Sequence, residues 1–166
     1  IGSAIGARVI AACSSDEKLD FARAAGAHDC INYSSTDLRT AIRELTGGRG
    51  ADVVYDTVGG AYFDSSIRSL AWNGRLLVVG FASGTIPQFS VNLALVKGIS
   101  VIGVFWGTFT EKEPDVHAGN MLELYDWIES GLIRPQINAR FPLENCIDAL
   151  RYVGERKVLG KVVMIP

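Results

Sequence analysis

Short apolar runs alternate with stretches of helical periodicity along most of the chain. Residues 8–13 (RVIAAC), 51–56 (ADVVYD) and 75–80 (RLLVVG) are apolar runs of strand length. Between the first two runs, apolar residues recur at the helical spacing i, i+3, i+4, i+7: Leu38, Ala41, Ile42 and Leu45. Alternating strands and helices predict a parallel sheet, and near-continuous apolar strands predict helices on both faces. The predicted fold class is a doubly wound α/β sheet, with the strand at 51–56 buried on both faces.

Turn residues and further apolar stripes predict the remaining elements. Ser15 is a candidate cap for a helix that Gly26 ends, and Gly74 turns the chain into the strand at 75–80. The other expected elements are strands at 30–33 and 99–106, and helices around Phe63 and Ile67, at 92–97 and along 121–132.

The pattern changes after Pro135. One helix at 143–152 and one strand at 161–165 follow, and they do not continue the earlier alternation. We interpret residues 1–132 as a truncated dinucleotide-binding domain and residues 133–166 as a segment that packs on a second domain.

The opening residues IGSAIGA have the pattern of a last helical turn that ends at Gly6. A dinucleotide-binding sheet usually opens with a strand, a glycine-rich turn and a helix, and Gly2 and Gly6 do not form that turn. We therefore expect the first strand and the phosphate-binding turn to lie upstream of residue 1. In the strand order 3-2-1-4-5-6 the first strand is central, so the strands at 8–13 and 51–56 would each lack a neighbour. The chain alone should then be poorly stable, unless upstream residues, direct re-pairing or a partner chain supply one.

Composition excludes several function classes. The 166 residues have a net charge of −2 and no basic tract, which argues against nucleic-acid and anionic-membrane partners. The apolar runs are too short to span a bilayer, and we expect a cytoplasmic protein. Three distant cysteines (Cys13, Cys30 and Cys146) and two isolated histidines (His28 and His117) show no zinc spacing. We expect reduced, buried thiols and no metal site.

The order of five segments, RVIAACSSDEK, AGAHDCINY, GADVVYDTVGG, GRLLVVGFASG and GKVVMIP, resembles the medium-chain dehydrogenase/reductase superfamily. The stretches SLAWNGRLLVVGFASGTIP and NLALVKGISVIGVFWG resemble its quinone oxidoreductase branch in particular. The resemblance covers essentially the whole chain. It implies an NADPH-dependent enzyme of longer chain, whose amino-terminal part is the catalytic domain, and a homodimer joined through the edge strand 99–106.

Small hydroxyl residues stand where NAD-binding folds carry an acidic residue that binds the ribose hydroxyls. Ser14 and Ser15 follow the strand at 8–13 and leave space for the 2′-phosphate of NADPH. By the resemblance, Ser14, Lys18 and Tyr33 match the positions that hold this phosphate. Alternatively, Ser15 caps a helix, Lys18 is solvated and Tyr33 packs. Asp16 would favour NAD if its carboxylate turned toward the ribose.

Glycine and aromatic residues at the ends of other strands are the remaining candidates. Gly59 allows the backbone to approach a ligand, or simply makes a tight turn. By the resemblance, the nicotinamide and its ribose lie near Gly80, Phe81 and Phe105. Arg156 matches a position near the cofactor phosphates, or is a solvated charge.

No nucleophile paired with a base and no carboxylate pair is evident, so the catalytic residues are unknown. Hydride transfer to a quinone or an enone needs little acid–base chemistry from the protein, because the cofactor carries the reaction. We expect NADPH-dependent hydride transfer to a small-molecule quinone or similar acceptor, with this chain inactive alone. The alternatives are an enoyl reductase or alcohol dehydrogenase of the same superfamily, and a non-catalytic nucleotide-binding protein.

Overall fold

The computed structural model describes residues 1–155 and 158–166. Its seven described strands form three separate parallel sheets. The first sheet pairs β1 (Ile10–Cys13) with β2 (Asp29–Asn32); the second has the order β3 (Ala51–Asp56), β4 (Leu70–Val78), β5 (Ser100–Gly103); the third pairs β6 (Ile137–Pro142) with β7 (Lys161–Ile165).

Helices connect the strands, as the apolar pattern predicted. In chain order they are α1 (Asp16–Ala24), α2 (Leu38–Leu45), η1 (Gly60–Tyr62), α3 (Phe63–Arg68), α4 (Asn92–Lys97), α5 (Trp106–Lys112), α6 (Pro114–Glu129), η2 (Leu143–Asn145) and α7 (Cys146–Gly154). The hydroxyl of Ser15 caps α1 by accepting from the Lys18 N–H at 3.4 Å. The Asp37 carboxylate caps α2 by accepting from the N–H and the hydroxyl of Thr40, and these bonds hold the pKa of Asp37 below its ordinary value.

The opening residues form one helical turn. The Ile5 N–H donates to the carbonyl of Ile1, the Gly6 N–H to Ser3, and the Ala7 N–H to Gly2, at 2.9–3.0 Å. With Gly6 at φ 80°, these are the bonds with which a helix ends in a left-handed glycine. The expected turn that closes on Gly6 is therefore present, while the helix that it would end stays a prediction.

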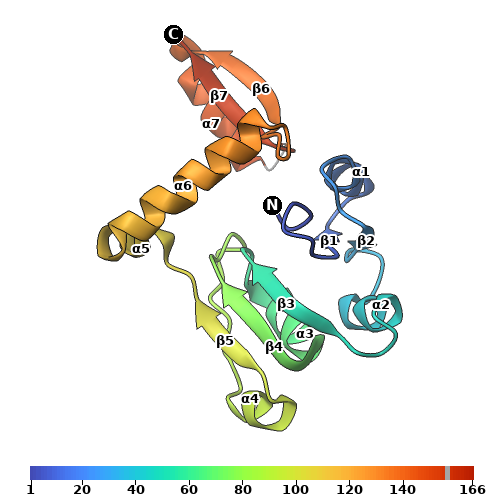
Figure 1. The fold of residues 1–166 in the computed structure, drawn as a ribbon. Coiled ribbons are helices and arrows are strands. Elements are labelled where there is room, and N and C mark those ends of the chain that lie inside the picture. Colours follow the sequence, from blue (N-terminus) through green and yellow to red (C-terminus); the bar gives the residue numbers. More distant parts are fainter. Residues whose placement is uncertain (156–157) are drawn as a thin grey trace.

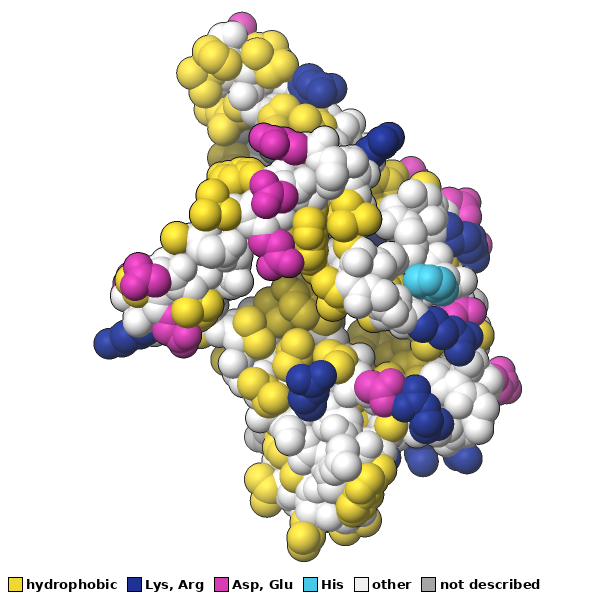
Figure 2. Space-filling model, viewed as in Figure 1, with side chains coloured by type: hydrophobic (Ala, Val, Ile, Leu, Met, Phe, Trp, Pro, Cys, Tyr) yellow, Lys and Arg dark blue, Asp and Glu magenta, His cyan; other side chains and the backbone are white. Residues whose placement is uncertain are grey.

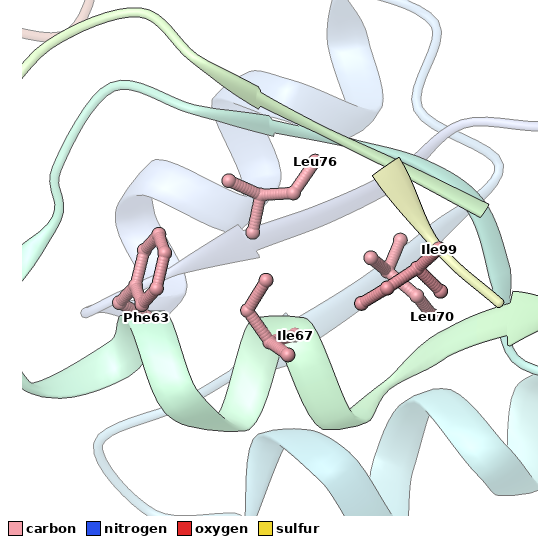
Figure 3. Close-up of a cluster of buried hydrophobic side chains, with 5 residues drawn as sticks. All are labelled: Phe63, Ile67, Leu70, Leu76 and Ile99. Carbon is pink, nitrogen blue, oxygen red and sulfur yellow. The ribbon is translucent and has the colours of Figure 1, made fainter. Parts of the chain in front are cut away.

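Buried apolar residues gather in two clusters. One lies between α3 and the β3–β4–β5 sheet, and Figure 3 shows its five buried members: Phe63, Ile67, Leu70, Leu76 and Ile99. The other lies between α2 and the β1–β2 pair and consists of Ile31, Leu38, Ala41 and Ile42. The β1–β2 pair and the β3–β4–β5 sheet thus each have a small core of their own.

One face of the β3–β4–β5 sheet is bare, which corrects the prediction that 51–56 is buried on both faces. Val54 packs toward α3, but Val53 and Tyr55 point the other way and are 41% and 65% exposed. The β1–β2 pair differs, because α2 packs against Ile31 while the thiol of Cys30 bonds the Leu19 carbonyl of α1. Helices therefore cover both faces of the small sheet and one face of the larger one.

Two further boundaries differ from the predictions. The strand expected at 99–106 ends at Gly103, because the chain leaves the sheet after the Val104 N–H donates to the Val78 carbonyl, and Trp106 begins α5. Neither α5 nor β6 was predicted. The β6 sequence INARFP has only scattered apolar residues and ends in proline, so it lacks the apolar run by which the other strands were recognised.

The arrangement of the strands leaves β1 and β3 each with one paired edge. The observed orders β2-β1 and β3-β4-β5 are those of a 3-2-1-4-5-6 sheet without its first strand. Among the described residues no ladder joins β1 to β3, so direct re-pairing of the two strands does not occur.

The later part of the chain extends away from the sheets. In Figure 1, α5 and α6 lead from β5 to the β6–β7 pair, which packs with α7. The expected apolar stripe of α6 is confirmed only in part, because Met121 and Leu124 are half-buried whereas Tyr125, Ile128 and the following Leu132 are exposed. Figure 2 shows hydrophobic side chains in a recess beneath α6. The domain boundary at 132/133 stays a prediction.

Hydrogen exchange on the 166-residue chain tests the unpaired edges. Val9 and Cys13 accept from the β2 side, and Asp56 accepts from the β4 side, so strand alternation directs the amides of Ile10, Ala12, Val53 and Tyr55 to the unpaired edges. We expect these four amides to exchange much faster than those of Ala11 and Val54, which face paired strands. Equal protection along both strands would show that another strand pairs with these edges.

Candidate functional site

The carboxyl ends of the strands in the β1–β2 and β3–β4–β5 sheets meet at one edge of the molecule. The strands within each sheet are parallel, so their carboxyl ends lie on the same side. The ring of Tyr33, which follows β2, packs at a tilt of 47° against Tyr62 in η1, which follows β3, with ring centroids 4.3 Å apart. This contact brings the carboxyl ends of β2 and β3 together and joins the predicted site residues of the two sheets.

Ser14 and Lys18 lie where β1 passes into α1. The carbonyl of Ser14 accepts from the Ser34 hydroxyl at 2.9 Å, which ties the end of β1 to the chain after β2. Ser14 itself is exposed, and the half-buried Lys18 makes no ion pair with any carboxylate in the described part of the chain. A hydroxyl and an uncompensated ammonium group at the start of a helix suit an anionic group.

The Asp16 carboxylate is bonded to β2. Its Oδ1 accepts from Asn32 Nδ2 at 2.8 Å, and Asn32 Oδ1 in turn accepts from the Ser34 N–H at 3.1 Å. The side-chain amide of Asn32 is thus fixed at both ends. One oxygen of the Asp16 carboxylate is therefore engaged by a neighbouring strand, and whether Asp16 favours NAD stays untested.

Cys13 is not an activated nucleophile. Burial raises the pKa of its thiol, the nearby Cys30 adds to the increase, and the positive charge of Lys18 opposes it. Cys13, Cys30 and Cys146 are all free thiols, as expected, but they are half-buried, whereas the sequence predicted buried ones.

Backbone hydrogen bonds join the loops that follow β3 and β4. The N–H groups of Val79, Ala82 and Ser83 donate to successive carbonyls of Asp56, Thr57 and Val58, at 2.9–3.1 Å. The Gly60 N–H donates back to the Thr85 carbonyl at 3.2 Å. The two loops therefore form one structure that presents Gly59, Gly80 and Phe81 together.

Gly59 occupies a backbone conformation that only glycine adopts readily. It has φ 63° and ψ −146°, and a Cβ there would lie 2.9 Å from Phe81 Cδ1. The Phe81 ring therefore packs directly on the Gly59 backbone. The tight-turn interpretation of Gly59 fits this geometry, because the space beside it is taken by protein atoms.

Gly80 is a different case. Its φ is not in the left-handed region, and a Cβ there would meet only the Thr57 carbonyl oxygen, at an ordinary 3.5 Å. The fold would accept alanine at this position. A requirement for glycine would therefore come from something that the protein binds.

Asp56 is a structural residue of the site that the sequence reasoning did not single out. Its Oδ1 accepts from the N–H groups of Val58 and Gly59, both at 2.9 Å. An aspartate at a strand end, followed closely by Gly-Gly, is the available sequence signal for such a turn. Asp56 fixes the turn that places Gly59 under Phe81.

The remaining candidates are less well assembled. Phe105 immediately precedes α5 and is 77% exposed, while Trp106 packs edge-on against His117 with centroids 5.6 Å apart. The Val104 N–H, which donates to the Val78 carbonyl of β4, connects this segment to the strand ends. Arg156 lies outside the described residues. A cavity of about 360 Å³ between β2 and α2 contains none of the predicted site residues.

The parallel strands, their order within each sheet and the helices between them define an α/β fold of the Rossmann type. The chain belongs to the zinc-binding dehydrogenase family, whose model matches residues 1–121.

Similar proteins are named as reductases. The chain is 43% identical to quinone oxidoreductase-like protein 2 of Mus musculus over 158 residues, covering 95% of this chain and 45% of that protein. It is 32% identical to a 2-haloacrylate reductase of a Burkholderia species, covering 98% and 49%. A mycobacterial protein solved in complex with NADPH matches with a TM-score of 0.89 and 32% identity, covering 99% of this chain and 51% of that one. The chain thus spans about half the length of these relatives.

The described residues do not fit a zinc ion. No group of three histidine, cysteine, aspartate or glutamate side chains lies close enough together, within residues 1–155 and 158–166, to hold a metal. Within the same residues, no helix has the length and apolar character needed to cross a bilayer.

Two glycine substitutions separate a structural role from a binding role. Gly59→Ala should destabilise the protein by about 1–3 kcal/mol, because alanine is strained at this φ and its Cβ would displace Phe81. Gly80→Ala should cost less than about 0.5 kcal/mol. Urea unfolding of both variants measures the difference, and equal costs would show that the two glycines do not differ as described.

Proposed function

We propose that this chain is the nucleotide-binding part of an NADPH-dependent oxidoreductase that transfers hydride to a quinone or a similarly activated acceptor. The observation that carries the proposal is the end of β1. There Ser14 is exposed, Lys18 makes no ion pair with a carboxylate of the described residues, and the neighbouring Asp16 is bonded to Asn32. A 2′-phosphate needs hydroxyl and cationic partners and is repelled by a free carboxylate. The NADPH complex of the mycobacterial protein supports the same cofactor.

The residues present fit NADPH in three places. Ser14 and Lys18 would hold the 2′-phosphate, with Tyr33 beside them. Gly80 would allow the nicotinamide ribose to approach the backbone, and Phe81 and Phe105 would lie near the ring. Bound NADPH supplies the hydride, and these residues bind and orient it. Arg156 remains a proposed phosphate contact on the resemblance alone.

Other parts of the cofactor site would come from outside these residues. We infer that a strand between β1 and β3, and the glycine turn that follows it, complete the sheet and bind the pyrophosphate. The chain alone would then bind NADPH weakly and have no activity. Residues 133–166 would pack on a catalytic domain that contributes the acceptor site.

The acceptor is tested in the whole protein that contains this chain. The names of two relatives favour quinones and 2-haloacrylates, both of which are activated alkenes that accept hydride. We expect the whole protein to oxidise NADPH with quinones or enones as acceptors, and not to reduce NADP⁺ with alcohols as hydride donors. Alcohol oxidation would favour an alcohol dehydrogenase, and binding of NADPH without turnover would favour a non-catalytic protein.

We also propose that the whole protein is a homodimer joined through β5. This strand pairs with β4 on one side only among the described residues, and Ile102 on it is 39% exposed. Ile102→Lys should shift the whole protein from dimer to monomer in sedimentation experiments, because a charge would be buried in the interface. Lys112→Ala on α5 should leave the protein a dimer. A monomeric wild type would contradict the proposal.

Lys18→Ala tests the 2′-phosphate site. We expect the Kd for NADPH to increase about 10–100-fold, the effect of losing one hydrogen bond from a charged donor, while the Kd for NADH stays the same. Titration of the whole protein measures both constants, and Lys112→Ala provides the matched control. An equal loss for both cofactors would mean that Lys18 does not contact the 2′-phosphate.

A further inference from the structure

Asn32 occupies a position from which it controls the Asp16 carboxylate. It ends β2 in register with Cys13, the last residue of β1, so its side chain lies beside the first turn of α1. Its Nδ2 donates to Asp16 Oδ1 at 2.8 Å. Its Oδ1 accepts from the Ser34 N–H at 3.1 Å, which prevents the amide from rotating without the loss of a bond.

The same short segment also fixes the other side of the site. The Ser34 hydroxyl donates to the Ser14 carbonyl at 2.9 Å, and the Tyr33 N–H donates to the Cys13 carbonyl at 3.1 Å. Asn32, Tyr33 and Ser34, at the end of β2, thus bond both to the end of β1 and to the start of α1. The position of the Asp16 carboxylate relative to Ser14 depends on this connection.

The consequence is a choice between two cofactors. A free carboxylate at the start of α1 could accept hydrogen bonds from the ribose hydroxyls of NADH and would repel the 2′-phosphate of NADPH. A carboxylate bonded to Asn32 has one oxygen engaged and is directed toward β2. We propose that Asn32 is a positioning residue that sets the preference for NADPH by holding Asp16 away from the ribose. This inference rests on the proposed function.

The test is the ratio of NADH to NADPH dissociation constants in the whole protein. Asn32→Ala should lower this ratio about tenfold, the size expected when one hydrogen bond to a charged group is lost. Asp16→Asn in the Asn32→Ala background should restore the wild-type ratio, because no carboxylate is left to turn. Asp16→Ala alone should leave the ratio unchanged, and this variant keeps the inference testable if Asn32→Ala does not fold.

The outcomes separate this inference from the proposed function. If wild-type protein prefers NADPH but Asn32→Ala weakens both cofactors equally, Asn32 is only structural and the inference is wrong. A large rise in the ratio for Asp16→Ala would also overturn it, because Asp16 would then already face the ribose in the wild type. Wild-type protein without preference for NADPH would contradict the proposed function itself, and this inference with it.

Discussion

The need of every strand for hydrogen-bond partners governs this structure. β1 pairs with β2 and β3 pairs with β4, but within residues 1–155 and 158–166 each has an unpaired edge and the two strands do not pair with each other. Unpaired backbone groups tolerate water but not burial, so these edges stay accessible and the sheet stays divided. The division explains why the buried apolar residues form two small clusters, one for each part.

The candidate site depends on the same constraint, because its residues come from both sides of the division. Ser14 and Lys18 belong to the β1–β2 side, whereas Gly59, Gly80 and Phe81 belong to the joined loops after β3 and β4. The packing of Tyr33 against Tyr62 connects the two sides at their carboxyl ends. A central strand would hold the two sides in register and place its turn between them. Hydrogen bonds within one side, such as the Asp16–Asn32 bond, do not depend on that strand.

The sequence predicted most of the elements because each carries a local signal. Ser15 and Gly26 mark the limits of α1, and the spacing of Leu38 to Leu45 marks α2. The errors arose where tertiary context decides. The apolar composition of 51–56 could not reveal that one face lacks a covering helix, and β6 has no apolar run. Among the site residues, the strand-end positions were predicted, but the Asn32 and Asp56 hydrogen bonds were not, because they depend on the orientation of side chains between neighbouring elements.

A crystal structure of the whole protein that contains this chain would test the central claim most directly. The account predicts a strand from outside these 166 residues, parallel to β1 and β3 and hydrogen-bonded to both, followed by a glycine turn and a helix that ends at Gly6. A sheet in which β1 pairs directly with β3, or in which the space between them holds no strand, would contradict it.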